Sequence, residues 1–198
     1  SEQYWIERYA RGGDSGPGSY EEMAQFKAEI LNDFVARHDI RTVAEYGCGD
    51  GEQLRLANYP KYIGFDVSTE ALARCEDVFG DDRTKTFKLM RDYCGERADL
   101  ALSLDVIYHL VEDNVFESYM ERLFDSAIRY VIVYSSDTDE QESVQVPHVR
   151  HRRFSRWVEE NRVEWELVGK VPSKYPYSAL DFTGTFSDFH IYRKTHSA

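Results

Sequence analysis

The residues best suited to bind a ligand are three glycines at alternate positions, followed further along the chain by an aspartate. Gly47, Gly49 and Gly51 lie in the segment VAEYGCGDG, directly after a short apolar run. Glycines at the end of a strand allow a tight turn and let a ligand approach the backbone closely. Asp66 ends the next apolar run, where mononucleotide-binding units place an acid that accepts hydrogen bonds from ribose hydroxyls. The pattern therefore predicts a nucleoside-binding site.

The spacing of the glycines distinguishes this loop from a dinucleotide-binding fingerprint. Glu52 stands where a G-x-G-x-x-G motif has its third glycine, and Gly51 comes one residue earlier. With Glu45 two residues ahead of Gly47, the motif reads E-x-G-x-G-x-G. It resembles the glycine motif of class I S-adenosylmethionine (SAM)-dependent methyltransferases, whose cofactor carries no phosphate. A structural turn that binds no ligand, and a nicotinamide or flavin site, are the alternatives.

The resemblance implies a set of cofactor-binding residues. By the family's pattern these are Glu45, Gly47, Gly49, Asp66, Asp92 and Leu104. Glu45 would position the methionine amino group indirectly, and the first two glycines would flank the methionine portion of SAM. Asp66 would hold the ribose. Asp92, in the segment MRDY after the third predicted strand, matches the acid that commonly meets the adenine amino group. The alternative for Asp92 is a solvated loop residue.

Three histidines and an aspartate are the candidate catalytic residues. Asp105 and His109 follow the fourth predicted strand, and the resemblance places them facing the SAM sulfonium. A histidine titrates near neutral pH, so His109 is a candidate base for a hydroxyl acceptor, with a packing or SAM-contacting role as the alternative. His148 and His151 lie on the polar passage after the fifth strand, and either is a candidate base. The alternative for this passage is a solvated basic segment.

Acidic residues at the same end of the predicted sheet raise the question of a metal. Carboxylate oxygens are the ligands that hard divalent cations prefer in proteins. The acids concerned are Asp105, Asp137, Asp139 and Glu140. Their spacing defines no ligand set. Magnesium is therefore a second candidate cofactor beside SAM, and its ligands are unknown.

The elements that must position these residues alternate between strands and helices. Apolar runs predict strands over 42–46, 62–67, 86–89, 100–104 and 130–134, and helical patterns lie at 20–38, 52–58, 69–78, 113–126 and 154–161. Two further strands, 166–171 and 188–192, have no helix between them and predict an antiparallel hairpin. The alternation predicts one Rossmann-like α/β domain, mostly parallel, with helices on both faces. The resemblance implies a seven-stranded sheet that ends in this hairpin.

The N-terminal segment predicts a lid over the site. Residues 11–19, RGGDSGPGS, are dense in glycine, serine and proline, as loops are. Tyr4, Trp5 and Tyr9 precede them and offer aromatic faces to cover a cofactor. We therefore expect a single domain over residues 1–198 with a lid at about residues 1–20.

The composition limits the expected partners and location. The chain has 36 acidic residues and 24 lysines and arginines, a net charge of −12 that repels a phosphate backbone, so we expect no nucleic acid partner. No apolar run approaches the ~20 residues that span a bilayer, and the first residues lack a signal-peptide pattern. Cys48, Cys75 and Cys94 have neither disulfide-framework nor zinc spacing. These features predict a cytoplasmic protein with free thiols.

The segment after the fourth strand bears on the methyl acceptor. It reads DVIY, without the Asn/Asp-Pro-Pro-Tyr signature of nitrogen-methylating relatives, which favours an oxygen acceptor. The GGDSG loop, the SLDVIYHL segment and the YSS strand end resemble small bacterial methyltransferases of glycan biosynthesis. That resemblance implies O-methylation of a saccharide hydroxyl. O-methylation of a small natural product or a carboxylate, and a non-catalytic SAM-binding module, are the alternatives. The sequence does not define the oligomeric state.

Overall fold

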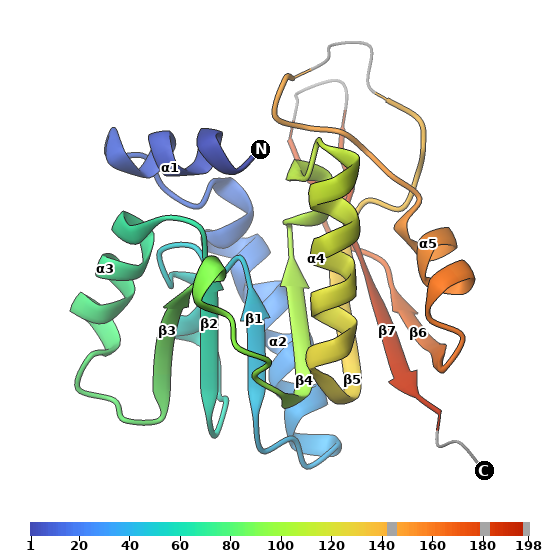
Figure 1. Cartoon of the computed structure of the whole chain (residues 1–198), viewed down its shortest axis with the longest axis horizontal. Helices are drawn as coiled ribbons and strands as arrows, with labels where there is room; N and C mark the ends of the chain where they lie inside the picture. Colours follow the sequence, from blue (N-terminus) through green and yellow to red (C-terminus); the bar gives the residue numbers. More distant parts are fainter. Residues whose placement is uncertain (142–145, 179–182, 196–198) are drawn as a thin grey trace.

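All seven predicted strands lie in one sheet (Figure 1). The computed structural model describes residues 1–141, 146–178 and 183–195. The strands are β1 (Val43–Tyr46), β2 (Tyr62–Asp66), β3 (Lys85–Leu89), β4 (Ala98–Leu104), β5 (Ala127–Ser135), β6 (Trp165–Val171) and β7 (Asp188–Lys194). Their order is β3-β2-β1-β4-β5-β7-β6, and β7 runs antiparallel to both neighbours while the other pairs are parallel. The predicted α/β fold with a C-terminal hairpin is confirmed.

Helices cover both faces of the sheet, as predicted. They are α1 (Glu2–Ala10), α2 (Glu21–Arg37), α3 (Thr69–Phe79), α4 (Asp113–Ser126) and α5 (Phe154–Asn161). Leu31 of α2 and Leu72 of α3 belong to a buried cluster on one face, and Met120 of α4 and Phe154 of α5 belong to the cluster on the other. Within the described ranges no helix combines the length and apolar character needed to cross a membrane.

Two elements differ from the sequence prediction. The helix expected over 52–58 is a single 3-10 turn, η2 (Gln53–Leu56). The side chain of Asn32 on α2 donates to the carbonyl of Leu56 at 2.8 Å and accepts from the backbone N–H of Asn58 at 2.8 Å. Asn32 thus takes the Asn58 N–H that a longer helix would pair with the Leu54 carbonyl, and Pro60 has no N–H to offer the Leu56 carbonyl, so the helix stops there. The N-terminal α1 was not predicted as a helix.

The chain direction places the site at one edge of the sheet. From β1 the chain moves outward through β2 to β3, then returns to β4 on the other side of β1. Open α/β sheets bind ligands beyond the carboxyl ends of the strands at such a reversal. In Figure 1, α1 lies beyond this edge and faces the ends of the central strands. Three further 3-10 turns, η1 (Pro17–Ser19), η3 (Met90–Asp92) and η4 (Ile107–His109), lie near it.

Candidate functional site

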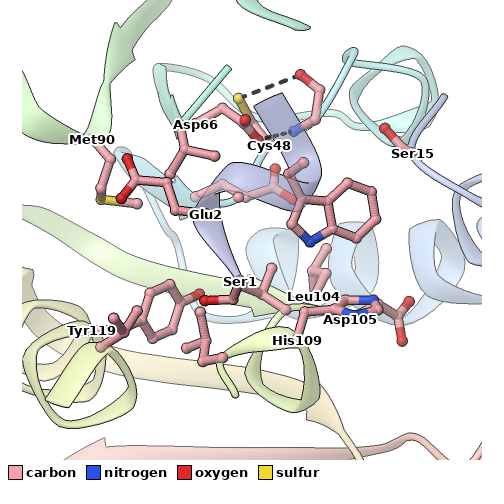
Figure 2. Close-up of a pocket in the computed structure, with 18 of the residues that line it drawn as sticks. Ser1, Glu2, Ser15, Cys48, Asp66, Met90, Leu104, Asp105, His109 and Tyr119 are labelled. Atoms are coloured by element: carbon pink, nitrogen blue, oxygen red, sulfur yellow. Dashed lines mark hydrogen bonds between the residues drawn. The ribbon is translucent and has the colours of Figure 1, made fainter. Parts of the chain in front are cut away.

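A cavity of about 360 Å³ lies at the carboxyl ends of the four strands β1 to β4. Each strand end contributes to it: Glu45 of β1 with the glycine loop that follows, Asp66 as the last residue of β2, Met90 directly after β3 and Leu104 as the last residue of β4. Helices α1, α2 and α4 supply the remaining walls. Figure 2 shows Asp66 and Met90 on one side of the cavity, and Leu104, Asp105 and His109 on the opposite side. A volume in this range is typical of small-molecule sites.

The glycine loop needs its glycines for both conformation and space. Gly47 and Gly49 have φ angles of 85° and 58°, in the left-handed region that glycine adopts without strain. A Cβ atom added to Gly47 would lie 2.5 Å from a methyl carbon of Val106, after β4. The Gly47 N–H donates to the carbonyl of Phe65 at 2.7 Å and so ties the loop to β2. Both predicted glycines therefore line the cavity in a conformation that side chains would disturb.

Two buried carboxylates stand on the cavity wall. Asp66 accepts the backbone N–H of Gly49 at 2.9 Å and that of Ser68 at 3.0 Å. Glu45 accepts the hydroxyl of Tyr62 at 2.7 Å, and its burial raises the pKa of the carboxyl to about 7. Burial also raises the pKa of Asp66. Because low-dielectric surroundings disfavour an unpaired carboxylate, both groups favour a ligand that brings positive charge or hydrogen-bond donors.

The N-terminal segment is fastened to the glycine loop through Asp50. The hydroxyl and backbone N–H of Ser15 donate to the Asp50 carboxylate at 2.6 and 3.1 Å, and the Tyr20 hydroxyl donates to it at 3.0 Å. The Tyr9 and Ser15 hydroxyls are 2.7 Å apart. Tyr9 and Ser15 both line the cavity. The segment thus covers the site, and its opening and closing as a lid stays a prediction.

Asp105 is held in place by an ion pair with a buried lysine. Its Oδ2 lies 2.8 Å from the Lys27 ammonium on α2, whose side chain is only 1% exposed. Its Oδ1 accepts the hydroxyls of Tyr108 at 3.1 Å and Ser187 at 2.8 Å. The Asp105 backbone has a φ of 58°, a strained conformation for a residue with a side chain. Asp105 lines the cavity as predicted, but both of its oxygens already serve to fix the turn after β4.

Among the predicted bases, His109 reaches the cavity. Its Nδ1–H donates to the carbonyl of His148 at 2.9 Å, which leaves Nε2 as the acceptor of the neutral ring. Burial lowers the pKa of His109 to about 4, so the ring is neutral at physiological pH. His148 lies beside His109 but is not part of the cavity lining, and its ring stacks on Tyr4. His151 is buried, with Nδ1 2.7 Å from the Ser136 hydroxyl.

Asp92 lies outside the cavity lining, and so do three of the four acids considered for a metal, Asp137, Asp139 and Glu140. Asp92 is exposed on η3, while its neighbours Met90 and Arg91 line the cavity. Asp137 accepts the backbone N–H of Ser155, and Asp139 accepts that of Arg153. In the part of the chain that the structure describes, no three His, Cys, Asp or Glu side chains are grouped as metal ligands. The magnesium suggestion therefore has no support.

Among the residues that the sequence prediction did not assign, the charged residues Lys27 and Arg91 line the cavity, and Asp50 binds the N-terminal segment beside it. Lys27 falls on the buried face of the amphipathic α2, and a lysine at an apolar position of a helix is the signal that would have pointed to it. Asp50 is the variable residue between two glycines of the motif, where nothing in the pattern distinguishes it. Arg91 lies beside Asp92, the residue whose type matches the family pattern.

Comparison with known proteins rests on structure. No protein-family profile matches this chain, and no curated protein sequence matches it. The N-methyltransferase NodS from Bradyrhizobium japonicum WM9, in complex with S-adenosyl-L-homocysteine (SAH), has a TM-score of 0.73 at 13% identity, covering 97% of this chain and 99% of that one. The magnesium protoporphyrin IX methyltransferase ChlM from Synechocystis PCC 6803 with bound SAH has a TM-score of 0.67 at 15% identity, covering 98% of each chain.

A third similar structure is the methyltransferase domain of the bacterial protein CtHen1. It has a TM-score of 0.65 at 17% identity and covers 87% of this chain and 98% of that one. All three are methyltransferases, and the chain shares their fold over most of its length. At these identities the likeness establishes the class of fold, a Rossmann-like methyltransferase fold, and leaves the chemistry to the residues of the site.

Proposed function

We propose that this chain is a SAM-dependent methyltransferase. The observation that carries the proposal is the convergence of Glu45, Gly49 and Asp66 on one cavity at the carboxyl ends of β1 and β2. These residues come from the predicted E-x-G-x-G-x-G motif and from the acid of the next strand. The likeness to structures described with bound SAH supports the same interpretation.

The two buried carboxylates fit the groups of SAM. Asp66 would accept hydrogen bonds from the ribose hydroxyls while its backbone contacts keep the glycine loop in place. Glu45 would face the methionine amino group through an intermediary, and a nearby cation would favour its ionised form. SAM carries its methyl group on a positively charged sulfur. The methyl group moves to the acceptor by in-line displacement. The protein's contribution is to align the acceptor with that methyl group and to exclude water.

The residues after β4 favour an oxygen acceptor. His109 lines the cavity with Nε2 available to take the proton of a hydroxyl. The comparisons do not decide the acceptor atom, since NodS is described as an N-methyltransferase. The saccharide acceptor predicted from the glycan-related resemblance has no support from these structures. We therefore propose O-methylation, with a saccharide hydroxyl and a small natural product as the two candidate acceptor classes.

Transfer of a labelled methyl group tests the proposal. The protein would be incubated with methyl-labelled SAM and a panel of saccharides, phenols and carboxylates, and both labelled product and SAH would be quantified. We expect label to move to one acceptor class with an equal amount of SAH. If SAM binds and no acceptor in a broad panel is labelled, the chain is instead a non-catalytic SAM-binding module.

A further inference from the structure

Two arginines lie at the rim of the cavity, beside the end of β3. Arg91 belongs to η3 and directly follows Met90, which lies on the same side of the cavity as Asp66 (Figure 2). Arg122 lies on α4, is half-buried and also lines the cavity. The central carbon of its guanidinium is 5.2 Å from the centre of the Tyr93 ring, and Tyr93 follows Arg91 by two residues. Both cations, called the arginine pair, therefore flank the same short segment after β3.

Two acids near this segment already have partners of their own. Both Asp125 and Glu96 act on the hydroxyl of Tyr93 through their charge. Asp125 forms an ion pair with Arg162 at 3.1 Å, and Glu96 forms one with Lys88 at 2.6 Å. In the ranges that the structure describes, neither member of the arginine pair forms an ion pair with a carboxylate. Their positive charge is therefore open to an incoming group.

The remaining charges of the cavity lining do not cancel the arginine pair. Lys27 and Asp105 neutralise each other at 2.8 Å. Glu2 of α1 lines the cavity and offsets at most one of the two positive charges. Asp92 is exposed and lies outside the lining. A positively charged rim thus stands out on a chain whose net charge is −12.

The face of α4 that lines the cavity adds further hydrogen-bond donors. Asn114, Ser118 and Arg122 follow one another at intervals of four residues, so their side chains lie along one face of the helix. The asparagine amide and the serine hydroxyl each donate hydrogen bonds, and a guanidinium donates through a fixed fork. Forked, charged donors of this kind are well suited to an oxyanion.

We propose that Arg91 and Arg122 form a subsite for the phosphate group of a small phosphate monoester. Such a group carries a charge of about −1.5 to −2 near neutral pH and three acceptor oxygens. Two guanidinium forks match it better than they match a carboxylate, which has a single charge and two oxygens. The net charge of −12 disfavours long phosphate polymers, which points to a small molecule. SAM carries no phosphate, so this subsite goes beyond the proposed function and does not depend on it.

Calorimetric titration with phenyl phosphate tests the proposal. The chain is titrated without cofactor at pH 8, where the phosphate is fully ionised because its second pKa is about 6. Benzyl alcohol is the uncharged comparison, and benzoate carries a single charge on a similar ring. We expect phenyl phosphate to bind at least about tenfold more tightly than benzyl alcohol and more tightly than benzoate. The affinity should fall as salt is added, because salt screens charges at an exposed rim.

Variants of the two arginines locate the binding. Arg122→Gln should weaken phenyl phosphate binding about tenfold, as expected for a hydrogen-bonded charge that is half-buried. Arg91→Gln should weaken it about threefold, because Arg91 is more exposed. Arg122→Lys should retain part of the affinity, since it keeps the charge and loses the fork. Arg83→Gln is the matched control, because it removes one positive charge outside the cavity lining.

The outcomes separate this subsite from the proposed function. Phenyl phosphate binding no tighter than that of benzyl alcohol, or equal losses in Arg122→Gln and Arg83→Gln, would overturn the subsite. Urea unfolding of each variant shows whether a loss of binding reflects a loss of folding, and Arg122→Lys provides a second, milder variant. Failure of SAH to bind the wild-type chain would refute the proposed function and leave this test intact.

Two sources of the phosphate group share this chemistry, the methyl acceptor and a separate effector. Incubation with methyl-labelled SAM and glucose 6-phosphate or phosphoserine distinguishes them. Label on the phosphorylated compound would identify the phosphate as part of the acceptor. A phosphorylated compound that binds through the arginine pair and changes the rate of transfer to another acceptor, while remaining unlabelled, would be an effector. Either result supports the subsite, provided that Arg122→Gln weakens it.

Discussion

The two sides of the cavity are built in different ways. The side that we propose for the cofactor, called the cofactor side, consists of the glycine loop, Glu45 and Asp66, all from one continuous stretch that includes β1 and β2, and backbone hydrogen bonds hold it together. The side that we propose for the methyl acceptor, called the acceptor side, combines α1, η4 and the segment around His148, which are far apart in the sequence and meet mainly through rings. Under the proposed function, local sequence defines the site of the cofactor, whereas long-range packing shapes the site of the acceptor.

The largest expected effect is on the cofactor side. Asp66→Ala removes the buried acceptor of the Gly49 N–H and, under the proposed function, the acceptor of two ribose hydroxyls. Hydrogen bonds to charged groups contribute roughly 1.5–3 kcal/mol each, so we expect SAH affinity to fall by about 4 kcal/mol. Calorimetric titration measures this directly. Asp92→Ala is the matched control, because this exposed aspartate is outside the cavity lining. Equal losses of SAH affinity in the two variants would mean that Asp66 does not bind the cofactor.

On the acceptor side, the largest effect is expected for His109. His109→Gln should lower turnover at saturating acceptor by about 10²-fold, the lower end of the range for a general base, with SAH affinity nearly unchanged. His148→Gln should have a smaller effect, since the contact to His109 uses the His148 backbone carbonyl. His151→Gln should mainly lower stability, because His151 is buried against Ser136. Near-normal turnover in all three variants would exclude histidine as the base.

The ion pair between Lys27 and Asp105 ties α2 to the turn after β4. Lys27→Met would leave the partly exposed Asp105 carboxylate without its cation and release the strained turn after β4. Fully buried pairs lose more when one partner is removed, so we expect a decrease of about 2 kcal/mol in the free energy of unfolding, measured in urea. Lys174→Met, which breaks an exposed pair with Glu29, should change it by less than ~1 kcal/mol. Equal decreases in the free energy of unfolding for the two variants would mean that the Lys27–Asp105 pair stabilises the fold no more than an exposed pair does.

The cofactor side should also show pH dependence. The raised pKa of Glu45, about 7, means that the carboxyl is mostly neutral at pH 6 and ionised at pH 8. A ligand ammonium favours the ionised form, so SAH affinity should rise with pH across this range, by at most about tenfold, and then level off. Glu45→Gln should remove the rise. An affinity that falls between pH 6 and pH 8 would contradict the assigned role of Glu45.

The smallest predicted effect concerns the N-terminal lid. Residues 11–19 contact the glycine loop through Ser15 and Asp50, so a bound cofactor beneath them should favour the closed arrangement. We expect tryptic cleavage at Arg11 to slow several-fold when SAH is added. Cleavage at the exposed Arg83, in the turn before β3, is the internal reference. Equal slowing or no slowing at the two sites would exclude a lid.

Much of the fold was predictable because its signals are local. The fully buried β1 and the mostly buried β4 contain short continuous apolar runs, and α4 was predicted with its observed ends, Asp113 and Ser126. The predicted length of the helix after the glycine loop was wrong because a distant side chain, Asn32, accepts the Asn58 N–H that would have extended the helix. Local propensity carries no information about such a contact.

The site was predictable only in part, for a related reason. Glu45, Gly47, Gly49 and Asp66 follow from a motif in which spacing fixes geometry, and all four line the cavity. The roles of the acceptor-side residues remain predictions, because burial and partners determine them. His109 and Asp105 reach the cavity, yet a buried environment makes the histidine a weak base and an unforeseen lysine engages the aspartate. These properties arise from packing between distant segments.

Calorimetric titration of the wild-type chain with SAH tests the central claim most directly. We predict saturable binding with one site per chain, strengthened as the pH rises from 6 to 8. The site needs no added metal in this account, so the same affinity is expected in the presence of a chelator. No binding of SAH, under conditions where the chain is folded, would contradict the assignment of this cavity to SAM.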